Sequence, residues 1–140
     1  SGEQKTFAQE LLTNWHDGRV KMFLIFCGLE LRNKNRDLFA YGQYTALSAN
    51  GKFRNNIIAF ARKNEEKCII AAVSRFVTFL ADQGQVPVGE LWEDTFVENK
   101  FTEYAKWKNV LTNETVIFSS QIYAKNLFET FPAAILVGEN

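Results

Sequence analysis

Residue types that bind transition metals are scarce in this sequence. Its 140 residues include one histidine, His16, and two cysteines, Cys27 and Cys68, and no Cys-x-x-Cys pair occurs. Neither a metal site nor a cofactor is therefore expected from these residues. Each cysteine lies within an apolar run, so we predict two buried free thiols and a reducing, cytoplasmic compartment.

An excess of charge of one sign and long apolar runs are also absent. The 16 lysines and arginines balance the 16 aspartates and glutamates, so the formal net charge is zero. A neutral chain has no electrostatic basis for binding nucleic acid or an anionic membrane surface. No apolar stretch reaches the roughly 18 residues that span a bilayer, and no signal peptide is visible. Neither nucleic acid nor a membrane is an expected partner.

The sequence does contain a large apolar and aromatic fraction. Hydrophobic residues make up 46% of the chain, and 13 residues are phenylalanine. This composition predicts one globular domain with an aromatic core rather than a disordered segment. The chain begins with Ser1-Gly2 instead of methionine, and helix-like sequence follows at once, so we expect a piece of a longer protein.

Apolar residues recur with helical spacing in two N-terminal segments. The first covers residues 7–15, with Thr6 as a candidate N-cap, and the second covers residues 19–35 after a glycine-containing break. Apolar residues occupy more than one side of the second helix, which predicts that it is buried on several sides. Its C-terminal end is basic, and we interpret these cations as partners of the helix macrodipole rather than as an anion site.

Strand patterns follow the helices. Asn50-Gly51 is a strong signal for a two-residue hairpin, and the runs at 57–61 and 68–73 are continuously apolar, which is typical of strands covered on both faces. A short helical turn is predicted at 123–128, before Pro132. Turn signals and apolar runs together predict seven strands, at residues 44–49, 57–61, 68–73, 91–97, 107–111, 115–118 and 133–137.

The predicted fold class is α+β: two N-terminal helices followed by an antiparallel β-sandwich. The change from helical to strand patterns lies near residues 38–42. We therefore divide the chain into a helical part, residues 1–37, and a sandwich domain, residues 38–140.

The motifs of self-sufficient enzymes do not occur. The sequence has no Gly-x-Ser-x-Gly, Gly-x-Gly-x-x-Gly, phosphate-binding loop or His-Glu-x-x-His. Three acidic residues, Glu90, Glu93 and Asp94, surround Trp92, and they could form an acid pair beside a sugar-stacking ring. We favour a polar strand edge with one inward aromatic, because acids adjacent in sequence specify no geometry. No catalytic residue is assigned.

Other candidate residues also have a structural interpretation that we favour. Trp15, Trp92 and Trp107 could each stack on a sugar ring, but large aromatics more often anchor a core or an interface. His16 could act as a general base, yet no orienting partner is visible, so a hydrogen bond at the helix end is favoured.

Two arginines come directly after apolar runs. For Arg62 and Arg75 we expect interface ion pairing or solvation at a strand end rather than catalysis.

Eight segments form an ordered series along the chain. They are Asp17-Gly18-Arg19-Val20-Lys21, Leu29-Glu30-Leu31-Arg32, Gly42-Gln43-Tyr44-Thr45-Ala46-Leu47, Ile58-Ala59-Phe60-Ala61-Arg62, Val73-Ser74-Arg75, Gly89-Glu90-Leu91-Trp92-Glu93-Asp94-Thr95, Trp107-Lys108-Asn109-Val110-Leu111-Thr112 and Phe131-Pro132-Ala133-Ala134. In their order and spacing these segments resemble the C-terminal region of malto-oligosyltrehalose synthases. Three positions depart from the family pattern, because Lys34 replaces an arginine, Ala46 replaces a proline and Asn109 replaces an aspartate.

The resemblance implies a parent enzyme of the α-amylase-like glycoside hydrolase clan. Such enzymes convert the reducing-end α-1,4 link of a maltodextrin into an α,α-1,1 link, with catalytic carboxylates in an upstream (β/α)₈ barrel. No family catalytic residue maps onto this chain. By the same resemblance, the two helices would close the barrel and the sandwich would pack on it, so the partners are that barrel and, in the parent, maltodextrin.

Three functions are consistent with the sequence. The resemblance favours a non-catalytic accessory region, and a piece cut from such an enzyme should expose apolar residues around Phe23, Leu24 and Phe26, or cover them by self-association. The alternative is an independent carbohydrate-binding module, with an exposed aromatic platform that includes Trp92. A small stand-alone enzyme using Glu90 or Asp94 would need a cleft with two carboxyl groups.

Overall fold

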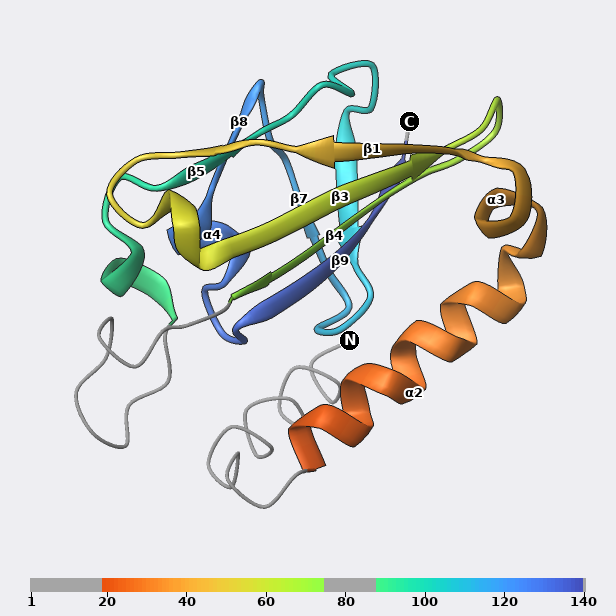
Figure 1. Cartoon of the computed structure of the whole chain (residues 1–140), viewed down its shortest axis with the longest axis horizontal. Helices are drawn as coiled ribbons and strands as arrows, with labels where there is room; N and C mark the ends of the chain where they lie inside the picture. The colour runs from red at the N-terminus through yellow and green to blue at the C-terminus, as the bar shows by residue number, and fades with distance from the viewer. Residues whose placement is uncertain (1–18, 75–87, 140) are drawn as a thin grey trace.

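The computed structural model describes residues 19–74 and 88–139, with side chains from Phe26 onward (Figure 1). The helix predicted at residues 7–15 lies outside this range. The described helices are α2 (Arg19–Lys34), α3 (Arg36–Tyr41), α4 (Ala124–Leu127) and the 3₁₀ turns η2 (Arg54–Asn56) and η3 (Gly89–Trp92). The described strands are β1 (Gln43–Leu47), β2 (Ala49–Asn50), β3 (Ile57–Lys63), β4 (Cys68–Ser74), β5 (Phe96–Glu98), β6 (Lys106–Asn109), β7 (Glu114–Val116), β8 (Gln121–Tyr123) and β9 (Ala133–Glu139).

The second predicted helix is present as α2, and its last turn carries Arg32 and Lys34 as expected. The segment that the sequence left between helix and strand folds as the short helix α3. The amide of Asn35 donates to the Leu31 carbonyl at 2.8 Å, and this bond marks the corner between the two helices. Leu38 is the buried residue of α3. The helix ends at Gly42, whose N–H donates to the Leu38 carbonyl at 2.8 Å.

The strands form two antiparallel sheets. The large sheet has six strands in the order β1-β3-β4-β9-β6-β7, and the small sheet has three in the order β2-β5-β8. Residues from both sheets pack into one core, so the sheets face each other as in a sandwich. Its members include Ala59 and Ile70 of the large sheet, and Val97 and Ile122 of the small sheet. The structure therefore agrees with an α+β class and a mostly antiparallel sandwich-like domain.

The predicted two-residue hairpin at Asn50-Gly51 is wrong. β1 does pair with β3, but residues 48–56 between them form β2 and η2, and β2 joins the small sheet instead. Gly51 has the expected positive φ, 102°. The backbone N–H of Lys52 donates to Asp94 Oδ1 at 3.1 Å, and that of Phe53 donates to Thr95 Oγ1 at 3.0 Å. These long-range hydrogen bonds prevent the segment from closing as a two-residue hairpin. Local sequence propensity contains no information about such distant acceptors.

The predicted strand at 91–97 is correct only in its second half. Residues Gly89–Trp92 form η3, and Glu93 has a φ of 49°, so a continuous strand cannot pass through this point. The turn directs Trp92 into the core. Strand β8 was not predicted, because its three residues are too few to show an alternating pattern.

Two glycines give opposite predictions for alanine substitution. A Cβ on Gly51 would lie 2.7 Å from Thr95 Cα in a left-handed backbone, whereas a Cβ on Gly28 meets nothing within 4 Å inside helix α2. Gly51→Ala should lower the free energy of unfolding by about 1–3 kcal/mol. Gly28→Ala should raise it by about 0.5–1 kcal/mol through helix propensity. Urea unfolding followed by circular dichroism measures both, and an unchanged midpoint for Gly51→Ala would contradict the packing of this turn on Thr95.

Candidate functional site

The acidic residues around Trp92 lie on the surface, where two of them contact one lysine. Glu93 Oε2 is 3.1 Å from Lys52 Nζ, and Asp94 accepts the backbone N–H of the same residue. Glu90 is exposed on η3. The contacts of Glu93 and Asp94 fasten the turn at residues 51–54 to the segment that carries Trp92. This geometry favours a structural role over an acid pair.

The two described tryptophans belong to the core. Trp92 and Trp107 are both fully buried. Trp92 packs against Phe128 with ring centroids 5.1 Å apart and meets Phe53 edge-on at 6.4 Å, and Trp107 packs against Tyr104 at 5.3 Å. A sugar platform that includes Trp92 is therefore wrong. Three further candidates, Trp15, His16 and Arg75, lie outside the described residues.

The basic end of β3 contacts aromatic rings. Arg62 lies 5.5 Å from the Tyr44 ring centroid, and its Nη1 donates to the Gly42 carbonyl at 3.1 Å. The next residue, Lys63, pairs with Glu103 and lies over the Phe101 ring at 5.5 Å. The hydrogen bond within this pair raises the pKa of Lys63 and lowers that of Glu103. The Arg62–Tyr44 contact and the Lys63–Glu103 ion pair are exposed enough that we expect each to contribute little to the free energy of unfolding.

The thiols differ in exposure. Cys68 is fully buried in the core, and this burial raises its pKa to about 12. Cys27 on α2 is partly buried, and its pKa is raised by burial first and by the charge of Glu30 second. Neither environment favours a thiolate nucleophile. Within residues 19–74 and 88–139, no group of three acidic, histidine or cysteine side chains is placed to hold a metal ion.

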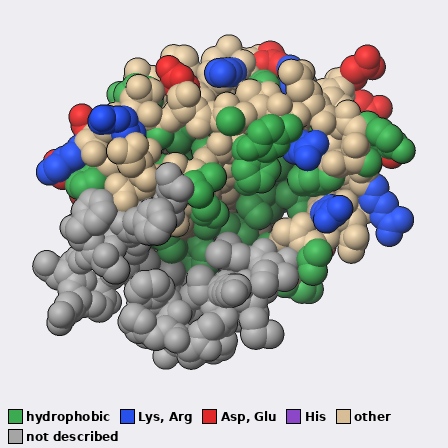
Figure 2. Space-filling view, in the orientation of Figure 1, with side chains coloured by type: hydrophobic (Ala, Val, Ile, Leu, Met, Phe, Trp, Pro, Cys, Tyr) green, Lys and Arg blue, Asp and Glu red, His purple; other side chains and the backbone are tan. Residues whose placement is uncertain are grey.

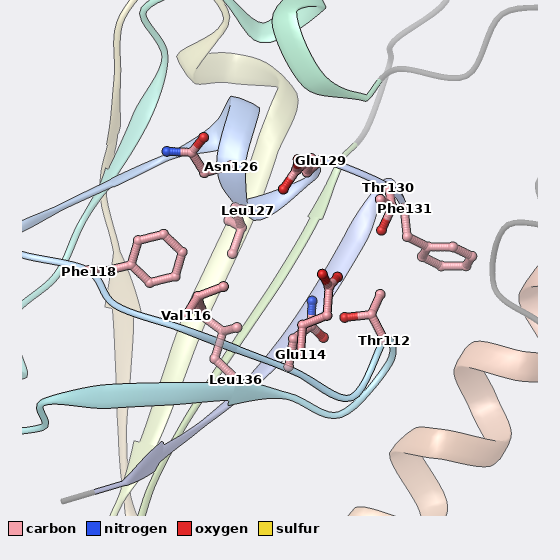
Figure 3. Close-up of a pocket in the computed structure, with 11 residues that line it drawn as sticks. Thr112, Glu114, Val116, Phe118, Asn126, Leu127, Glu129, Thr130, Phe131 and Leu136 are labelled. Atoms are coloured by element: carbon pink, nitrogen blue, oxygen red, sulfur yellow. The ribbon is translucent and has the colours of Figure 1, made fainter. Parts of the chain in front are cut away.

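A polar cavity lies between the β6–β7 turn and the segment after α4 (Figure 3). Its volume is about 30 Å³, which is room for a water molecule or two and too small for a sugar ring. The buried Thr112 Oγ1 at this cavity has no hydrogen-bond partner among the described residues, so a bound water would suit it. The carboxylates of Glu114 and Glu129 line the same space. Its size makes this cavity a hydration site rather than a substrate site.

The surface of the large sheet that faces away from the core is strongly apolar, and we call it the outer face. Register places its side chains in three rows across β1, β3, β4 and β9. The rows are Tyr44, Arg62, Ile69 and Val137, then Ala46, Phe60, Ala71 and Ile135, and then Ile58, Val73 and Ala133.

Part of the outer face is covered and part is exposed. Cys27 of α2 packs against the cluster that contains Ala133 and Ile135, so this helix covers one end. In contrast, Tyr44, Ile58 and Val73 are 56%, 45% and 40% exposed. Figure 2 shows hydrophobic side chains gathered near the middle of this view, with polar and charged groups above them. The prediction that β3 and β4 are covered on both faces therefore holds for the core face and only in part for the outer face.

The N-terminal helix adds apolar surface. Phe26 is 64% exposed and Leu29 is 55% exposed, whereas the side chains of Phe23 and Leu24 lie outside the described part. The predicted apolar patch is thus observed at Phe26 only. No helix in the described part of the chain is long and apolar enough to cross a bilayer.

The burial of the Cys68 thiol leads to a prediction about the stability of the protein at alkaline pH. An unfolded Cys68 loses its proton near the ordinary pKa of 9.0, whereas the folded thiol keeps it up to about pH 12. Between these values the unfolded chain binds fewer protons than the folded chain. The contribution of Cys68 to the free energy of unfolding is therefore fully present below about pH 9 and falls as pH rises, by up to about 1.4 kcal/mol per pH unit. Urea unfolding at several pH values should show this slope, and it should be shallower in Cys68→Ala.

Thiol labelling provides the control for this prediction. In the native protein at about pH 8, a thiol reagent should modify Cys27 alone, and both cysteines should react after unfolding. Rapid native labelling of Cys68 would contradict its burial.

The fold is similar to that of two solved enzyme structures. One is maltooligosyltrehalose synthase from Arthrobacter ramosus, 25% identical, with a TM-score of 0.64 over 94% of this chain and 16% of that chain. The other is a mutant of the same enzyme, 24% identical, with a TM-score of 0.64 over 96% of this chain and 17% of that chain. The chain thus spans less than a fifth of the solved enzymes. No family model and no curated protein matches it. In fold, the chain resembles a C-terminal region of maltooligosyltrehalose synthase, as its sequence segments do.

Proposed function

We propose that this chain is a non-catalytic C-terminal region of an enzyme related to maltooligosyltrehalose synthase. The whole enzyme would convert the reducing-end α-1,4 link of a maltodextrin into an α,α-1,1 link within the same molecule. The observation that carries the proposal is the structural likeness over 94% of the chain, with a TM-score of 0.64. The likeness covers only 16% of the matched enzyme, so the reaction itself is assigned to the remaining part.

The chemistry of the described residues supports a role without catalysis. Retaining and inverting glycoside hydrolases both need two carboxyl groups that flank a cleft. In this chain, Glu93 and Asp94 contact Lys52 at the surface, and Glu114 and Glu129 line a cavity of about 30 Å³. Neither arrangement offers space for a glycosidic bond between two carboxyl groups.

The outer face provides the surface for packing on the catalytic part. An antiparallel sheet that faces water carries polar residues on that side, whereas this one carries three rows of mostly apolar residues. A contiguous apolar surface of this kind is typical of an interface. The proposed occupant is the upstream barrel of the same polypeptide, with residues 1–37 contributing to the same junction.

The first test concerns the coding sequence and the activity. The reading frame upstream of residue 1 should encode a catalytic barrel, and a stop codon directly upstream would overturn the proposal. The longer polypeptide should convert maltopentaose into a non-reducing product of the same mass. The 140-residue chain alone should leave maltopentaose unchanged in the same assay. Turnover by the chain alone would contradict a non-catalytic role.

Charged substitutions on the outer face should affect the longer polypeptide far more than the isolated chain. Ile58→Asp and Val73→Asp place a carboxylate at half-exposed positions, so in the isolated chain each should cost about 1 kcal/mol or less. Against a docked barrel the carboxylate would be buried without a partner, which should lower the midpoint of thermal unfolding by about 5 °C or more. Differential scanning calorimetry of both proteins measures the contrast.

A matched control lies on the same face. Thr115 is exposed, pairs with Lys108, and belongs to the polar edge of the outer face. Thr115→Asp should leave the thermal midpoint of both proteins nearly unchanged. Equal losses for Ile58→Asp in the isolated chain and in the longer polypeptide would argue against docking at this face.

A further inference from the structure

The solvent-facing side of the small sheet carries aromatic and polar side chains. Val97 and Ile122 of this sheet are buried in the core, so their sequence neighbours project to the opposite side. Phe96 pairs with Tyr123 across β5 and β8, and Glu98 pairs with Gln121. Both aromatic residues are partly exposed, and both polar residues are exposed. Sequence analysis missed this set, because three-residue strands give little period-two signal.

The two rings form a tilted aromatic surface. The ring centroids of Phe96 and Tyr123 are 5.6 Å apart, with an interplanar angle of 56°. The Tyr123 hydroxyl donates to Gln121 Oε1 at 3.0 Å, which fixes the orientation of both side chains. A ring face that is held in place on a strand and open to solvent can stack on the apolar face of a pyranose, and a buried ring such as Trp92 cannot.

A groove of about 390 Å³ is lined by Phe96, the ring that packs against Tyr123, and its volume is within the size range of small-ligand sites. Phe96 lines it together with donors and acceptors of several kinds: Asn50, Glu98, Asn99, Lys100, Ser120 and Gln121. A neutral ligand with many hydroxyl groups can use amides, a carboxylate and an ammonium at once, because each hydroxyl both donates and accepts.

The groove is held rigidly at its base. The Asn99 amide donates to the Ser119 carbonyl at 2.9 Å, and Asn99 Oδ1 accepts the backbone N–H of Phe101 at 2.9 Å. The backbone N–H of Asn99 also donates to the Ser120 carbonyl at 2.9 Å. These bonds tie the two sides of the groove together, so little conformational entropy would be lost on binding.

We propose that this groove, between β5, β8 and the residues that flank them, binds a neutral oligosaccharide. The aromatic pair provides stacking, and Glu98, Lys100 and Gln121 bind hydroxyl groups. A single-stranded nucleic acid also stacks on aromatic side chains, but its phosphates would meet the Glu98 carboxylate in a chain of zero net charge. The choice of an α-1,4-linked glucan as probe rests on the proposed function, whereas the groove itself does not.

The test is a titration of the 140-residue chain with maltopentaose, followed by two-dimensional NMR and calorimetry. Saturable binding with a Kd of about 5 mM or tighter is expected, with shifts concentrated at residues 96–100 and 120–123. Tyr123→Ala and Gln121→Ala should each weaken binding by about fivefold or more. Gln121 is exposed, so its substitution tests the groove even if Tyr123→Ala unfolds the sheet.

The control for this test is an exposed aromatic residue far from the groove. Tyr41 is 86% exposed at the end of α3, and α3 lies away from β5 and β8 (Figure 1), so Tyr41→Ala should leave binding unchanged. No saturation up to about 20 mM sugar, shifts elsewhere, or binding of a thymidine oligonucleotide without binding of the sugar would overturn the groove proposal. None of these results affects the barrel-docking proposal, because that proposal is tested by the substitutions at Ile58 and Val73.

Discussion

The fold depends on a six-stranded sheet whose strands β1, β3, β4 and β9 are mostly apolar on both faces. Its inner face is closed by the small sheet and by Trp92, which the turn at η3 directs between Phe53 and Phe128. Among residues 19–74 and 88–139, α2 covers one end of the sheet's outer face, near Ile135. Burying both sides of such a sheet would give the full hydrophobic stabilisation, and the exposed part of the outer face is suited to packing against another layer.

The small sheet satisfies a different constraint. Three short strands supply one apolar row to the core, and their other side is free to carry polar and aromatic groups. Because the turn at residues 51–54 is fastened to Asp94 and Thr95, β2 stays beside β5 and completes this sheet. The same contacts that bury Trp92 therefore position the groove beside Phe96.

Sequence reasoning succeeded where the apolar pattern was long and failed where a tertiary contact decided the backbone. The patterns that predicted α2, β3, β4 and β9 lie in elements of seven residues or more, and these elements were located correctly. The backbone path after Gly51 was not predicted correctly, because hydrogen bonds to side-chain acceptors 42 residues away determine it. For Trp92 the sequence favours an inward aromatic over a sugar platform, and its burial confirms this interpretation. The 3₁₀ turn that directs the ring into the core is not evident from the sequence.

The two proposed surfaces are compatible because of the sandwich architecture. The large and small sheets pack their inner faces on one core, so their outer faces point in opposite directions. A catalytic barrel on the outer face of the large sheet would leave the groove on the small sheet open to solvent. An oligosaccharide held there would therefore be bound at a distance from the interface with the barrel. The region would then contribute stability through one face and substrate retention through the other, with the bond-making chemistry elsewhere.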